Sequence, residues 1–85
     1  MTDADRIAAY ANVPHGLAEI VVMTANRLGY PVKSVRREGQ TAPVVAARRV
    51  IAHKARAEGY SYPQIGRALN RDHTTVMSLL RGKVR

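Results

Sequence analysis

Four consecutive residues near the end of the chain, Asp72 to Thr75, carry side chains that could recognise hydrogen-bonding groups on nucleic-acid bases. The threonine hydroxyls can donate or accept, and their methyl groups can pack against the methyl group of thymine. His73 offers a ring N–H to a phosphate or a base acceptor. Asp72 has two interpretations: it caps the free amides of a following helix, or it accepts a hydrogen bond from a cytosine amino group. Both interpretations hold if one carboxylate oxygen of Asp72 caps the helix while the other faces a groove of the DNA.

Positive charge surrounds these four residues. The chain of 85 residues has 14 Lys and Arg against 6 Asp and Glu, a formal net charge of +8. Residues 1–26 hold one Arg against three acidic residues and carry −2, so residues 27–85, with 13 basic and 3 acidic side chains, carry +10. A segment this basic is typical of a protein that binds a polyanion.

Two short helices joined by a tight turn are expected to position these residues. Ser61 and Gln64 form a capping-box pattern, which predicts the start of a helix that covers residues 63–69. Asp72 is a candidate cap for a second helix over residues 73–81. This order predicts a helix-turn-helix over residues 61–82, in which the first residues of the second helix reach base edges in the major groove.

The rest of the chain also has helical periodicity. Three further helices are expected, over residues 3–11, residues 17–28 and residues 41–58. A turn is predicted near residues 33–35, followed by a polar loop at residues 36–40. We therefore predict an all-α fold of four to five helices in a single domain, residues 1–85, with residues 1–16 as an N-terminal extension or an extra helix.

The composition disfavours several other classes of protein. The chain has no cysteine, which excludes a disulfide scaffold and any thiolate metal site or nucleophile. No two of the three histidines are spaced at i, i+4, so we predict no metal and no cofactor. The sequence has no glycine-rich phosphate loop, nucleophile elbow or paired carboxylates, so we predict no enzyme activity and no small-molecule substrate. The longest apolar runs are too short to span a bilayer, so no membrane partner is expected.

Three sequence segments resemble the C-terminal DNA-binding domain of the bacterial replication initiator DnaA. Residues 71–76, Arg-Asp-His-Thr-Thr-Val, match the signature of that family. Residues 61–66 are similar to the family's Ser-Leu-Pro-Glu-Ile-Gly, and residues 47–52 are similar to its Ala-Arg-Gln-Ile-Ala stretch. The resemblance is good from about residue 46 and weaker from residue 17 to residue 45, which identifies residues 17–85 as a DnaA-C-like domain.

The resemblance implies a role for each matching position. His73, Thr74 and Thr75 would read base edges in the major groove, with Asp72 at its edge. The residues expected to contact the sugar-phosphate backbone are Arg48, Arg49, Tyr62, Pro63, Gln64 and Arg71, where Tyr62 and Pro63 would touch either the backbone or thymine methyl groups. The family also inserts an arginine of a basic loop into the minor groove, and the candidates for such a loop here are Arg36, Arg37 and Gln40.

The sequence departs from the family in two ways that bear on function. The family's turn usually carries two glycines before Arg-Asp-His, whereas this chain has only Asn70 there, so the turn is one residue shorter. The 85 residues hold no counterpart of the family's ATPase module, so we expect a protein that binds DNA without ATPase activity.

We expect sequence-specific binding of double-stranded DNA, in the control of replication initiation or transcription, in the cytoplasm at the nucleoid. The alternative is a protein-interaction adaptor in which the acidic residues 1–26 dock a protein partner and DNA binding is weak and independent of sequence. A DNA titration at physiological salt separates the two hypotheses.

Overall fold

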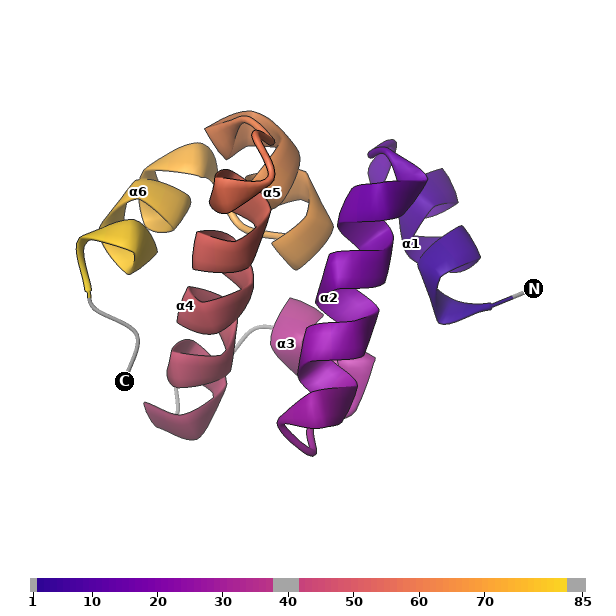
Figure 1. Cartoon of the computed structure of the whole chain (residues 1–85), viewed down its shortest axis with the longest axis horizontal. Coiled ribbons are helices and arrows are strands. Elements are labelled where there is room, and N and C mark those ends of the chain that lie inside the picture. The colour runs from indigo at the N-terminus through magenta and orange to yellow at the C-terminus, as the bar shows by residue number, and fades with distance from the viewer. Residues whose placement is uncertain (1, 38–41, 83–85) are drawn as a thin grey trace.

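The computed structural model describes residues 2–37 and 42–82, and these residues form six helices without a strand (Figure 1). In chain order they are α1 (Asp3–Ala11), α2 (His15–Arg27), α3 (Val32–Arg36), α4 (Ala42–Ala57), α5 (Tyr62–Leu69) and α6 (His73–Arg81). The predicted all-α fold is confirmed. The bounds of α1 and α6 are those expected from the sequence.

Two prolines account for the main differences from the expected helices. Pro14 is the N-cap of α2, and its carbonyl accepts hydrogen bonds from the amides of Leu17 and Ala18. The helix therefore begins two residues earlier than predicted. Pro31 is the N-cap of α3, a five-residue helix that replaces the predicted turn near residues 33–35. A proline suits these positions because its φ is fixed and no helical bond requires its missing N–H.

Helix α4 lies in the middle of the molecule and packs against α2, α3, α5 and α6. The molecule measures 32 × 25 × 21 Å, and α1 and α6 lie at opposite ends of its longest axis (Figure 1). Helix α1 packs against α2 and α5, whereas α6 packs against α4 and α5. The acidic N-terminal segment and the predicted recognition helix are therefore on opposite sides of the domain.

The core is aliphatic, and every helix contributes to it. The largest fully buried side chains are those of Leu17, Val21, Val35, Ile51, Ile65, Leu69 and Val76. Helix α1 adds Ala4 and Ile7 to this cluster. Because short helices with small apolar residues can approach closely, a core without Phe or Trp still holds all six elements together.

The turn between α5 and α6 depends on a close approach at Gly66. Asn70 ends α5 in the left-handed conformation (φ 56°), and the amide of Arg71 then donates to the carbonyl of Gly66 at 2.7 Å. A Cβ atom on Gly66 would lie 2.5 Å from the carbonyl oxygen of Arg71. The glycine therefore permits the chain to turn directly from α5 into the cap of α6.

We predict that Gly66→Ala lowers the free energy of unfolding by about 1–3 kcal/mol, as expected for overpacking against backbone. Helix propensity alone predicts the opposite sign, a gain of about 1 kcal/mol for Ala over Gly. Urea denaturation of this variant and of Arg67→Ala, an exposed control on the same helix, measures the difference. A Gly66→Ala variant as stable as the control would show that the turn does not need this contact.

Candidate nucleic-acid interface

Asp72 caps the N-terminus of α6, which confirms the capping interpretation. Its Oδ1 accepts hydrogen bonds from the backbone N–H of Thr74 at 2.8 Å and from the Thr74 hydroxyl at 2.6 Å. These bonds, the hydroxyl first and the amide second, lower the pKa of Asp72 below its usual value of 3.8. The side chain is therefore a carboxylate at neutral pH, where it stabilises the start of the helix.

The bond to Asp72 determines what the Thr74 hydroxyl can offer to a partner. A hydroxyl has a single proton, and Thr74 donates it to the carboxylate. Its oxygen lone pairs and its methyl group are left for a ligand. Thr74 is exposed, so in this arrangement it presents a hydrogen-bond acceptor at the surface.

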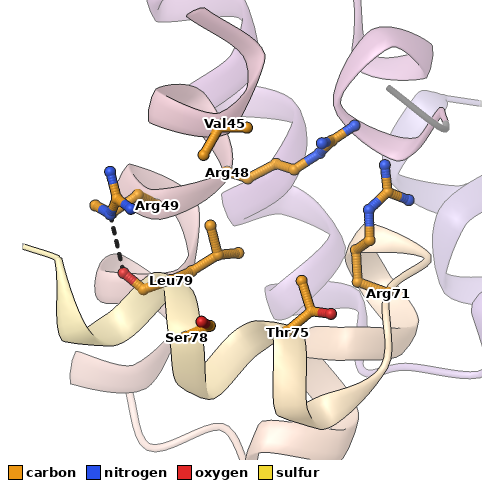
Figure 2. A pocket seen from close by; sticks show the side chains of 7 residues that line it. All are labelled: Val45, Arg48, Arg49, Arg71, Thr75, Ser78 and Leu79. Carbon is orange, nitrogen blue, oxygen red and sulfur yellow. Dashed lines mark hydrogen bonds between the residues drawn. The ribbon is translucent and has the colours of Figure 1, made fainter. Parts of the chain in front are cut away.

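The three residues expected to read bases lie in two environments. His73 and Thr74 are exposed in the first turn of α6. Thr75 is half-buried and faces a hollow of about 190 Å³ between α4 and α6 (Figure 2). All three side chains thus reach the surface, but Thr75 points toward α4 instead of out from the helix start.

Arginine and hydroxyl side chains line this hollow. Its residues are Val45, Arg48, Arg49, Arg71, Thr75, Ser78 and Leu79. Arg49 donates through Nε to the carbonyl of Leu79 at 3.0 Å, which ties its guanidinium to α6 (Figure 2). Arg71 donates to the carbonyl of Asn70 at 2.8 Å and to that of Arg37. Three of the predicted backbone contacts, Arg48, Arg49 and Arg71, are therefore brought together with Thr75.

Sequence reasoning missed Ser78, which lies on the same side of α6 as Thr75. The spacing of three residues could have indicated it, because residues i and i+3 of a helix are neighbours on one face.

Arg48 lines the same hollow, but its side chain is buried and bound to backbone carbonyls. The residue is 3% exposed, and its guanidinium donates from Nε to the carbonyl of Val35 at 2.8 Å and from Nη2 to the carbonyl of Arg37 at 2.5 Å. Burial, with a smaller contribution from the charge of Arg71, lowers the pKa of Arg48. Because the last carbonyls of a helix have no partner within it, Arg48 acts as a cap for α3, and the phosphate contact expected of it disagrees with this burial.

The two described candidates for the minor groove, Arg36 and Arg37, lie in different environments. Arg36 is half-buried and donates through Nε to the carbonyl of Ala68 at 2.9 Å, which holds α3 against the end of α5. This bond disagrees with the expected insertion of Arg36 into a groove. Arg37 is exposed beyond the end of α3, and Gln40 lies outside the described residues.

The start of α5 presents the other expected backbone contacts. Gln64 completes the predicted capping box, since its Oε1 accepts from the amide of Ser61 at 3.0 Å. Pro63 is exposed next to it. The half-buried ring of Tyr62 lies under the guanidinium of Arg56, 4.7 Å from the ring centroid, which is a cation–π arrangement that fixes the ring.

The opposite end of the domain holds acidic side chains paired with a histidine. His15 contacts Asp5 through Nε2 at 2.9 Å and Glu19 through Nδ1 at 2.8 Å.

In the part of the chain that the structure describes, no group of three or more His, Cys, Asp or Glu could hold a metal ion. No helix among these residues is long and apolar enough to cross a membrane.

Two helices joined by a three-residue turn, with a capped second helix exposed beside a cluster of arginines, define a helix-turn-helix DNA-binding domain. The family model described as "Bacterial dnaA protein helix-turn-helix" matches residues 17–81 of the 85. The chain belongs to this DNA-binding family, and α1 lies outside the matched residues. Neither the curated proteins nor the solved structures compared with the chain include a significant match.

We predict that Arg48→Met destabilises the domain by about 1–3 kcal/mol, because the carbonyl of Val35 loses the donor Arg48 and that of Arg37 keeps only Arg71, while the apolar volume is largely kept. Thermal or urea unfolding measures the loss, with Lys54→Met, an exposed position on the same helix, as the control. Equal stability of the two variants would contradict a capping role for Arg48.

Proposed function

We propose that the protein binds double-stranded DNA in a sequence-specific manner, with α6 in the major groove. The observation that carries this proposal is the exposure of His73 and Thr74 in the first turn of a helix whose start is fixed by Asp72. The first residues of a recognition helix are those that reach base edges. Half-exposed and exposed arginines on neighbouring elements supply the charge that attracts the phosphates.

The hydrogen-bond polarity of Thr74 indicates which bases it reads. Because its proton is committed to Asp72, the hydroxyl accepts from an exocyclic amino group, which adenine and cytosine carry in the major groove. Guanine O6 and thymine O4 are acceptors and do not satisfy it. His73 is free to donate a ring N–H to such an acceptor on a neighbouring base pair.

Contacts at the edges of the interface would set the register of the helix on the duplex. Pro63 and the Tyr62 ring lie at the start of α5, where they can contact the sugar-phosphate backbone. Gln64 lies beside them, with its backbone amide and its side-chain oxygen both engaged in the capping box with Ser61. Arg37 is exposed just beyond the end of α3, where its side chain can approach the DNA backbone.

This binding would control replication initiation or transcription, and the protein would act at the nucleoid in the cytoplasm. Such a domain would act by occupying its site and competing for it with other proteins. The alternative function is an adaptor that docks a protein through residues 1–26, where Tyr10 is 86% exposed. The adaptor predicts weak DNA binding that does not depend on sequence.

Selection of bound duplexes from a random pool tests the proposal. We expect one enriched motif, bound at least about 10³-fold more tightly than random DNA at physiological salt. In that motif, Thr74→Val is expected to lose roughly tenfold in affinity and to relax the preference at one adenine or cytosine, because the acceptor is removed while the shape is kept. A pool that enriches no motif would favour the adaptor.

A further inference from the structure

We infer that two copies of this protein associate through α2, with the exposed residues Glu19, Met23 and Arg27 of one copy packed against the same residues of the other. This self-association requires no DNA, so it goes beyond the proposed function. It also gives a role to an exposed methionine that lies outside the DNA-binding surface.

Helix α2 exposes a row of side chains, Glu19, Met23 and Arg27, which follow one another at intervals of four residues and so share one face of the helix. Met23, in the middle of the row, is 61% exposed, whereas methionine is among the residue types most often buried. Arg27 forms no ion pair with any other residue that the structure describes. Glu19 is half-exposed, and only one of its carboxylate oxygens is bonded to His15. The row therefore offers an apolar centre with a charge of each sign at its ends.

A groove of about 270 Å³ runs beside this row, between α2 and α4. Its α2 wall consists of Ile20, Met23, Thr24 and Arg27. Ile20 and Thr24 form the neighbouring row of the same spacing, so the groove lies between two rows of side chains that are four residues apart. Helices whose rows of this kind interlock cross at about −50°, which is the commonest class of helix packing in globular proteins. The row of one copy thus fits the groove of another.

The charges along the row are complementary to themselves. Glu19 precedes Met23 by four residues and Arg27 follows it by four. In a two-fold symmetric pair with antiparallel α2 helices, the two methionines therefore meet at the axis, and each Arg27 lies opposite the Glu19 of the other copy. The α4 wall adds one charge of each sign, Lys54 and Glu58, so it does not disturb this balance.

This symmetry identifies the occupant of the groove as a second copy in the antiparallel orientation. A parallel pair in the same register would place Glu19 beside Glu19 and Arg27 beside Arg27, which is repulsive at both ends. The flexible thioether side chain of Met23 fills irregular apolar gaps, which suits it to the centre of such a contact.

A dimer formed through α2 leaves the DNA-binding surface free. Helix α4 packs against both α2 and α6 and lies between them in Figure 1. Each copy thus keeps its recognition helix, and a two-fold dimer carries two of them, which suits an inverted repeat of half-sites. Two copies bound side by side on DNA have an effective concentration in the millimolar range, so even a weak dimer would make their binding cooperative.

Sedimentation equilibrium of the protein without DNA tests the self-association. We expect a reversible dimer with a dissociation constant on the order of 100 μM, because one pair of helices forms a smaller interface than the standard size. A protein that remains monomeric up to about 1 mM would leave the groove to a different partner and overturn the inference.

Charge-reversal variants identify the surface. In Glu19→Arg, and equally in Arg27→Glu, like charges meet at both ends of the contact, so each variant alone is expected to associate at least about tenfold more weakly than the wild type. An equimolar mixture of the two variants restores both opposite pairs and is expected to form a heterodimer about as tight as the wild-type dimer. A mixture that associates no better than the separate variants would overturn the inference.

Two control variants separate the contact from other effects. His15→Ala removes the bond between His15 and Glu19, and Arg67→Glu reverses an exposed charge on α5. Both are expected to dimerise like the wild type. Circular dichroism and thermal unfolding establish that every variant is folded. If all variants dimerise equally tightly, the contact lies elsewhere on the molecule and the inference is overturned.

The dimer and the proposed function can fail separately. A dimer that responds to the charge reversals as expected, in a protein that enriches no motif from the random pool, would support the inference and refute sequence-specific binding. A protein that enriches a motif but stays monomeric would support the function and overturn the dimer.

Discussion

The carbonyls of residues 35–37, at the end of α3, all accept hydrogen bonds from side chains, and the placement of the DNA-binding elements depends on these bonds. Arg48 of α4 donates to the carbonyls of Val35 and Arg37. Asn70 donates to the carbonyl of Arg36 at 3.3 Å, and Arg71 also donates to that of Arg37. The carbonyls at the end of so short a helix have no partner within it, and leaving them unpaired beside the core would be costly. Satisfying them joins α3, α4 and the turn before α6 into one unit.

The recognition helix is fixed at both of its ends. Asp72 and the Gly66 contact hold its start, while Arg49 and His53 of α4 contact the carbonyls of Leu79 and Gly82 at its end, the latter at 2.7 Å. An interface ordered in this way loses little entropy on binding. The paired carboxylates of Asp5 and Glu19 belong to α1 and α2, and α1 lies at the opposite end of the molecule from α6 (Figure 1), so Asp72 is the acidic residue at the start of α6.

Features set by neighbouring residues were predictable, whereas those set by distant segments were not. The caps at Ser61 and Asp72 and the bounds of α6 follow from local side-chain patterns, and the structure confirms them. The five-residue α3 is too short for hydrophobic periodicity to reveal. Arg48 lies three residues before the buried Ile51, which was a signal of its burial, but its acceptors come from α3. The hollow beside Thr75 likewise depends on the packing of α4 against α6.

We propose that the first turn of α6 and the arginines beside it form the surface that meets DNA. The most direct test is an NMR titration of the ¹⁵N-labelled protein with duplex DNA, which follows the backbone amides and the arginine Nε–H groups together. We expect the largest shifts in residues 72–78 and at Nε of Arg49 and Arg71, with α1 unaffected. Shifts concentrated in α1 and the first half of α2, with α6 unchanged, would contradict it.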